Sequence, residues 1–230
     1  MDTSTLGSSF SKSNDHYSAT AYGSPINDII MVDNGWVSTL TMGAGDDIVH
    51  AKDADAADSI DMGSGDDFLI INDDANDISL NGGDGTDWLA FRTVNWGAGA
   101  AKTYTLNSGN ASNFENLLGT DGNDTLTGDG NANVIAGAEG NDTINGGDGN
   151  DTLWGDCTTS ACQTLISQNQ SSYSLSDGGN DTLNGGAGND TLYGEEGDDT
   201  IDGGAGDDTI ISGSGSDVIV ITSTSGSDTL

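Results

Sequence analysis

The sequence predicts an all-β chain that winds into a stack of parallel coils, as a β-helix or β-roll does. Three observations predict this class: a glycine- and aspartate-rich motif that returns at a fixed interval, one aliphatic residue at a fixed place after each motif, and few apolar residues elsewhere. Hydrophobic residues make up 33% of the 230 residues, and 36 glycines stand against a single proline. This composition disfavours a globular enzyme of ordinary build, because it cannot fill a thick two-layer core.

The charge of the chain restricts its partners. There are 38 Asp and Glu residues against 4 Lys and Arg, so the formal net charge is −34. We therefore expect neither nucleic acid nor an anionic membrane as a partner. No apolar run approaches the roughly 20 residues of a spanning helix, so we expect no membrane insertion. A folded state must recruit something cationic to offset the repulsion.

The first half of the chain repeats at an interval of 20 residues. Residues 1–25 are predicted to be a polar N-terminal segment rich in Ser and Thr. Within residues 26–96 the glycine motif returns at 42–47, 62–67 and 82–87, and a short apolar strand such as Ile48-Val49 follows it. A second short strand such as Ser59-Ile60 precedes the next motif, so each coil has two strands. The second turn of these coils lacks the motif, which predicts metal loops along one edge only.

The second half repeats at an interval of nine residues. Residues 97–118 match neither interval and are predicted to be degenerate coils. Residues 119–230 carry nonapeptides in two blocks, and the aspartates Asp151 and Asp181 on either side of the break are 30 residues apart. This separation equals one nonapeptide and 21 further residues. It predicts a loop insertion near residues 155–175 that leaves the register of the stack unchanged.

Each nonapeptide has glycine at positions one, two and four, aspartate at position six and an aliphatic residue at position eight. Glycine allows a positive φ and close backbone approach, so six residues can form a tight turn. The position-eight residues are predicted to point inward and form a thin core: Leu126, Ile144, Leu153, Leu183, Leu192, Ile201 and Ile210. Strands this short need partners, and coils stacked about 4.8 Å apart supply them.

Stacking also superimposes the position-six aspartates. Carboxylates about 5 Å apart repel by roughly 3 kcal/mol at an effective dielectric constant of about 20. Calcium resolves the repulsion because it takes six to eight oxygen ligands, whereas Mg²⁺ is too small and too strongly hydrated for a carbonyl-rich cage. Zinc is disfavoured by the presence of only 2 Cys and 2 His. We predict about 8–10 calcium ions.

The predicted calcium ligands are the position-six aspartates and the loop glycines whose carbonyls turn inward. The aspartates are Asp47, Asp67, Asp87, Asp124, Asp142, Asp151, Asp181, Asp190, Asp199, Asp208 and Asp217. The glycines are Gly43, Gly45, Gly63, Gly65, Gly83, Gly85, Gly147, Gly149, Gly186, Gly188, Gly204 and Gly206. Asn133 departs from the motif at position six, and Asp129 and Asn131 replace glycines in the same repeat.

The motif GGxGxDxUx, tight from Gly119 to Val220 and looser from Leu40 to Ala90, resembles the RTX (repeats-in-toxin) nonapeptide. The resemblance implies a right-handed parallel β-roll that binds Ca²⁺ between coils and leaves the cell unfolded through type I secretion machinery. The chain looks most like the C-terminal region of a type I-secreted bacterial adhesin. A secreted or cell-surface location follows from the resemblance, with folding driven by extracellular calcium. We expect a monomer whose partners are calcium ions and the secretion machinery.

We expect a structural module and no enzyme, because the chain contains no HExxH, GxSxG or Walker motif. Two alternatives stay open. One is a calcium-binding helper module of a secreted enzyme, whose catalytic part would lie upstream of Met1. The other is an ice-binding solenoid, which needs a regular ladder at positions three and five; pairs such as Glu139/Asn141 and Glu196/Asp198 are charged and irregular.

Two cysteines, Cys157 and Cys162, lie in the insertion. Their five-residue separation could close a small disulfide in an oxidising environment, and free thiols are the alternative. A redox or metal role is disfavoured because no CxxC motif and no neighbouring histidine accompany them.

Overall fold

The computed structural model describes residues 19–32, 37–51, 59–71, 79–91, 101–157, 178–221 and 226–230. Every helix or strand within these ranges is a short β-strand. The strands are β1 Ala19–Tyr22, β2 Ile29–Val32, β3 Val37–Thr41, β4 Ile48–Ala51, β5 Ser59–Ser64, β6 Phe68–Ile71, β7 Ser79–Asp84, β8 Trp88–Phe91, β9 Thr103–Thr105, β10 Ala111–Ser112, β11 Asn116–Leu118, β12 Thr125–Thr127, β13 Val134–Ala138, β14 Thr143–Asp148, β15 Thr152–Asp156, β16 Thr182–Ala187, β17 Thr191–Tyr193, β18 Thr200–Ala205, β19 Thr209–Ile211 and β20 Val218–Val220. None of the described segments is a helix that could cross a membrane.

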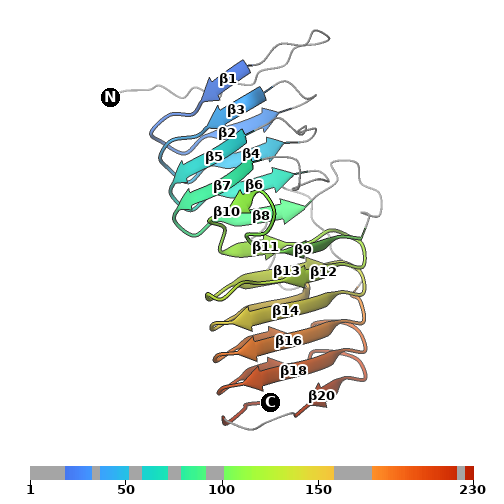
Figure 1. The fold of residues 1–230 in the computed structure, drawn as a ribbon. Coiled ribbons are helices and arrows are strands. Elements are labelled where there is room, and N and C mark those ends of the chain that lie inside the picture. Colours follow the sequence, from blue (N-terminus) through green and yellow to red (C-terminus); the bar gives the residue numbers. More distant parts are fainter. Residues whose placement is uncertain are drawn as a thin grey trace, which may run out of the picture. The chain divides into compact units, whose positions relative to one another are not determined.

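The chain divides into two compact units. The first comprises Met1–Asn95 and Asn107–Phe114. Its strands β1, β3, β5, β7 and β10 pair side by side in that order, and β2, β4, β6 and β8 form a second column (Figure 1). The strands within each column pair in parallel, for example with Leu69 opposite Leu89. Successive coils of this unit are therefore stacked, as the 20-residue interval predicts.

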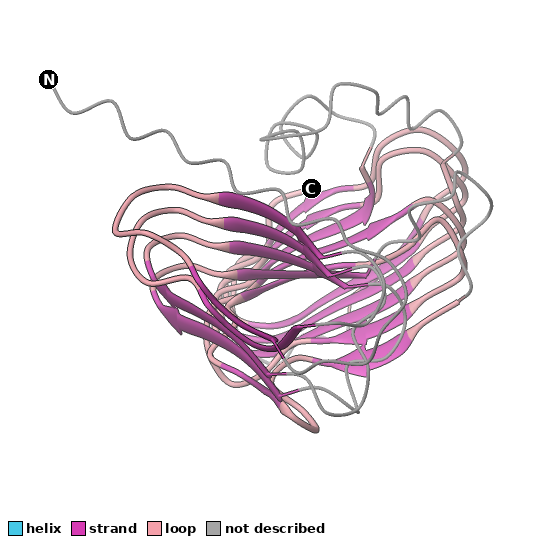
Figure 2. Ribbon diagram, turned by 90° about the horizontal axis from the view of Figure 1, so that it is seen from above, coloured by secondary structure: helices cyan, strands magenta, loops and turns pink. Residues whose placement is uncertain are grey.

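The second unit comprises Trp96–Leu106 and Glu115–Leu230. One sheet runs β9, β12, β14, β16, β18, β20, and a second column runs β11, β13, β15, β17, β19, again with parallel pairing. Seen from above, the strands of successive coils lie over one another, with loops joining their ends (Figure 2). The prediction of an all-β parallel solenoid is confirmed.

The core of the second unit is a pair of aliphatic ladders. In one sheet Leu126 pairs with Ile144, which in turn pairs with Leu183. All seven predicted position-eight residues are buried, at 4% exposure or less. Each buried Leu or Ile side chain contributes about 1.5–3 kcal/mol relative to an exposed one. The predicted thin core is confirmed, and it is one side chain deep in each sheet.

The insertion interrupts a single loop. Gly155 and Asp156 are the last residues of β15, Cys157 follows them, and the described chain resumes at Gly178. Strands β14 and β16, on either side of this break, pair directly. Cys157 is fully buried and disulfide-bonded, and Cys162, the other cysteine of the sequence, lies outside the described residues. The second turns of the 20-residue coils and residues 1–18 also lie outside the described part.

Candidate metal centre

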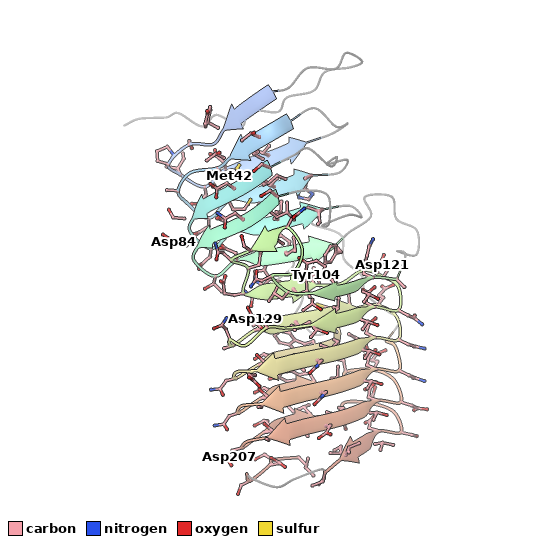
Figure 3. All side chains as sticks on the ribbon, in the orientation of Figure 1. Met42, Asp84, Tyr104, Asp121, Asp129 and Asp207 are labelled. Carbon is pink, nitrogen blue, oxygen red and sulfur yellow. The ribbon has the colours of Figure 1, made fainter. Side chains whose placement is uncertain are left out.

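The position-six residues of successive loops lie above one another in three columns. The first unit has one column, Asp28, Asp47, Asp67 and Asp87; the second unit has two, Asp124, Asp142, Asp181, Asp199 and Asp217 on one edge, and Asn133, Asp151, Asp190, Asp208 and Asp228 on the other. Figure 3 shows the two edges of the second unit, with Asp129 and Asp207 on one and Asp121 on the other. The structure therefore brings together the aspartates that the sequence predicts, edge by edge.

One carboxylate oxygen of each column aspartate except Asp28 is held by the preceding coil. The backbone N–H of Asp47 donates to Asp67 Oδ1 at 2.7 Å, and that of Asp151 donates to Asp190 Oδ1 at 2.7 Å. The same bond joins Asp142 to Asp181 across the insertion, at 2.7 Å. These bonds orient the carboxylates and direct the second oxygen of each towards the inside of its loop.

That second oxygen has no hydrogen-bond partner in eight of the predicted ligands. They are Asp47, Asp67, Asp142, Asp151, Asp181, Asp190, Asp199 and Asp208, each at most 2% exposed. A buried polar atom without a partner costs about 1–3 kcal/mol, and more when it is charged. No three His, Cys, Asp or Glu side chains gather into a cluster among the described residues. Carboxylate oxygens are hard donors of the kind that fit calcium.

The position-one glycine leaves room for these oxygens. A Cβ at Gly146 would lie 2.4 Å from Asp151 Oδ2 and 2.5 Å from the carbonyl oxygen of Gly185, in the next coil. Oxygens from two successive coils thus converge over this glycine, as a shared calcium site requires. Of the two reasons for glycine that the sequence suggests, a positive φ is not found at Gly146 or Gly185, and close approach is. Glycine stands there because any side chain would fill the space between the oxygens.

At positions two and four the predicted positive φ is confirmed. It lies between 94° and 152° at Gly43, Gly45, Gly63, Gly65, Gly83, Gly85, Gly147, Gly149, Gly186, Gly188, Gly204 and Gly206. Close stacking adds a second reason for glycine, because a Cβ at Gly186 would lie 2.0 Å from the carbonyl oxygen of Gly147. These glycines form the tight loops that hold the aspartates in place.

Burial raises the pKa of most aspartates in the columns. The pKa of Asp142 rises to about 8, and those of Asp67 and Asp181 rise to about 7. Loss of hydration is the largest cause; the hydrogen bond from the preceding coil lowers each value, and the neighbouring carboxylates raise it again. The pKa values of Asp47, Asp151 and Asp190 rise to about 6 for the same leading reason. A bound cation would favour the ionised form.

These shifts predict that the calcium-free fold is more stable in acid. A carboxyl group whose pKa is higher in the folded chain than in the unfolded chain binds more protons when folded, so stability falls as pH rises through that window. The pKa values of about 6 to 8 in the folded chain stand against an ordinary value of 3.8, so stability is lost between about pH 4 and pH 8. Far-UV circular dichroism of the calcium-free protein should show more β-structure at pH 5 than at pH 8. Equal or greater structure at pH 8 would contradict the burial of these carboxyl groups.

Two aspartates of the columns, Asp28 and Asp228, were not predicted from the sequence. Asp28 begins the first column. Its 19-residue interval to Asp47 could have indicated this position in the sequence, but its loop lacks glycine at positions two and four. Asp228 follows Asp208 by 20 residues and accepts its backbone N–H at 3.2 Å. Both lie in loops that depart from the glycine motif, which explains why they were missed.

Asp156 was missed because the insertion separates it from the rest of its loop. It occupies position two, is fully buried, and burial raises its pKa to about 8. Its carboxylate accepts the backbone N–H of Gly179 at 2.9 Å and that of Glu196 at 3.3 Å. Asp156 thus joins the two ends of the interrupted loop. No pattern in the sequence indicates this role.

Comparison with known proteins supports the identification of the repeat. The RTX calcium-binding nonapeptide repeat matches the chain in four copies, at residues 112–143, 127–156, 176–210 and 190–219. No curated protein matches the chain. The chain therefore contains RTX nonapeptide repeats, which imply calcium binding. The loops at 42–47, 62–67 and 82–87 lie outside the matched segments but share the positive-φ glycines and the aspartate column.

Proposed function

We propose that this chain is a calcium-dependent structural module whose RTX loops hold calcium ions between successive coils. One observation carries the proposal: buried carboxylate oxygens without a hydrogen-bond partner recur along both edges of the second unit and along the column of the first. The eight aspartates with such an oxygen would hold the ions together with loop carbonyls. Calcium would supply the positive charge that these carboxylates lack.

The donor set supports calcium over other common metals. The oxygens that converge over Gly146 and Gly185 are carboxylate and carbonyl oxygens, and Ca²⁺ binds such donors in cages of six to eight oxygens at about 2.3–2.6 Å. Magnesium keeps much of its water and zinc prefers nitrogen and sulfur ligands. Binding would neutralise roughly half of the formal charge of −34 and leave an acidic surface.

We further propose that the module folds outside the cell after type I secretion and serves as a rigid, non-catalytic part of a secreted adhesin. The RTX repeats support export and calcium-driven folding. Extracellular modules bind calcium at about 10⁻⁴–10⁻³ M, so cytosolic calcium would leave the chain unfolded and extracellular calcium would fold it. The resemblance to adhesins and the lack of catalytic motifs in the sequence support the structural role.

Counting bound ions tests the proposal. Protein equilibrated with millimolar calcium and separated from free ions by gel filtration should retain about 8–10 calcium ions per chain, as measured by elemental analysis. Equal concentrations of magnesium should leave far fewer ions bound, because the cage is rich in carbonyls. A stoichiometry of two or fewer calcium ions would rule out the columns as the binding sites.

A further inference from the structure

The first loop of each column is closed by a hydrogen bond that is not formed in the loops of the eight aspartates named above. The backbone N–H of Thr120 donates to Asp124 Oδ2 at 2.5 Å, and that of Ser24 donates to Asp28 Oδ2 at 2.5 Å. In the same way, the N–H of Asp129 donates to Asn133 Oδ1 at 2.8 Å. In all three cases the residue at position two donates to the residue at position six of its own loop. We call loops 23–28, 119–124 and 128–133 the self-closed loops.

The accepting oxygen is the one that a cation would need. A Cβ at Gly119 would lie 2.4 Å from Asp124 Oδ2 and 2.4 Å from the carbonyl oxygen of Gly137. This arrangement reproduces the convergence over Gly146, where the corresponding oxygen of Asp151 has no hydrogen-bond partner. In a self-closed loop, an N–H group of the protein therefore already occupies the oxygen that would face the ion.

Backbone conformation distinguishes the self-closed loops from the open loops that the insertion does not interrupt. These open loops, such as 42–47, 146–151 and 185–190, have positive φ at positions two and four, whereas the interrupted loop that ends at Asp181 does not. The self-closed loops have positive φ at neither position, even where position four is a glycine, Gly122. Position two is Ser24, Thr120 or Asp129 in the self-closed loops, and glycine, Ala138 or Glu195 in the uninterrupted open loops, where Ala138 and Glu195 also have a positive φ. In the loops that the insertion does not interrupt, the φ at position two therefore differs between the self-closed and the open state.

Further bonds reinforce the closure of loop 119–124. Thr120 Oγ1 donates to Asp124 Oδ1 at 3.0 Å and accepts the backbone N–H of Gly122 at 3.0 Å. The backbone N–H of Lys102 also donates to Asp124 Oδ1, at 2.6 Å. Both oxygens of this carboxylate are satisfied by the protein.

Loop 128–133 is closed by side chains as well. Asn133 Nδ2 donates to the carbonyl oxygen of Glu115 at 2.9 Å. The carboxylate of Asp129 accepts the backbone N–H of Asn131 at 2.8 Å. A neutral amide at position six therefore fits a loop that binds no ion.

We propose that the three self-closed loops bind no cation and that each forms a calcium-independent first layer of its column. Cation binding then begins at the second loop of each column, where Asp47, Asp142 and Asp151 stand. The inference rests on the proposed function and refines it, because it removes Asp124 from the ligands that the motif predicts. The first layer still orients the second, since the N–H of Asp124 donates to Asp142 Oδ1 at 2.7 Å.

A matched pair of substitutions tests the inference by ion counting. Asp142→Asn should reduce the bound calcium by one ion relative to the parent chain, whereas Asp124→Asn should bind the same number as the parent. Both variants lose one carboxylate from the same column, and circular dichroism in excess calcium checks that each is folded. Loss of an ion in Asp124→Asn would overturn the inference. If Asp142→Asn loses no ion, the site assignment of the proposed function fails instead.

A second set of variants gives an answer even if Asp124→Asn does not fold. Asn133→Asp alone restores the aspartate of the motif, but the N–H of Asp129 still closes the loop, so no additional ion should bind. The triple variant Asp129→Gly, Asn131→Gly, Asn133→Asp restores the whole motif and should bind one more calcium ion than the parent. A gain of one ion in Asn133→Asp alone would show that the aspartate is sufficient and that the closed backbone does not exclude the cation.

Discussion

Removing calcium at neutral pH is expected to abolish the β-sheet signal in far-UV circular dichroism, and returning millimolar calcium should restore it in one cooperative transition. Without cations, two neighbouring carboxylates that are both ionised repel by roughly 3 kcal/mol at the spacing of the coils, and burial, which raises the pKa of Asp142 to about 8, opposes ionisation as well. The aliphatic ladders that oppose this repulsion are only one side chain deep, at residues such as Leu126 and Ile144. The repulsion therefore outweighs the core.

Mass action explains why the effect of calcium should be large. At tenfold excess over its dissociation constant, one bound ion stabilises the folded state by about 1.4 kcal/mol. Eight ions at that excess contribute about 11 kcal/mol, which equals the total stability of a typical domain. Because every ion would bridge two coils in the proposed arrangement, the contributions would depend on the same stacked state, and folding should be steep in calcium concentration.

The control is magnesium at the same concentration, in the presence of a chelator selective for calcium. It should not restore the signal, because screening of charge alone does not supply the oxygen-rich coordination of calcium. A spectrum at neutral pH that is unchanged by the chelator would show that the aspartate columns are stable without cations.

Replacing Gly188 by alanine is expected to destabilise the calcium-loaded fold by about 1–3 kcal/mol or more. Gly188 has a φ of 145°, and a Cβ there would lie 1.5 Å from the carbonyl oxygen of Gly149. Neither the conformation nor the contact can accommodate a methyl group, because the obstructing atom is backbone. Thermal unfolding in saturating calcium should show a clearly lowered Tm.

Gly130→Ala is the matched control. Gly130 lies in loop 128–133, its φ is not positive, and a Cβ there would have no atom within 4 Å. Its Tm should stay close to that of the parent chain. Equal losses of stability in the two variants would mean that the stacked backbones are not in the close contact that the structure shows.

The predictions that succeeded were those that depend on the repeat. Position eight is buried in every predicted case, and positions two and four have the predicted positive φ at all twelve glycines named. The reason is that a fixed interval places equivalent residues at equivalent points of successive coils, so one local argument applies to all of them. At position one only one of the two reasons given for glycine applies, because the backbone approaches closely there but φ is not positive at Gly146 or Gly185.

The roles of Asp124 and Asp156 could not be predicted in this way. Asp124 has the same motif position as Asp142, yet its oxygens are taken by Thr120 and Lys102. Asp156 joins loop ends that the insertion separates by more than 20 residues in the chain. Both roles depend on contacts with residues that the repeat does not specify.

The sequence by itself determined the parallel solenoid, its inward-facing residues and the columns of aspartates, because periodicity and stacking suffice to place them. Only the tertiary structure decided which carboxylate oxygens lack a partner. That property depends on the direction of individual N–H groups, which is set by the backbone of each loop and by the coil before it, and residues with the same position in the motif differ in both.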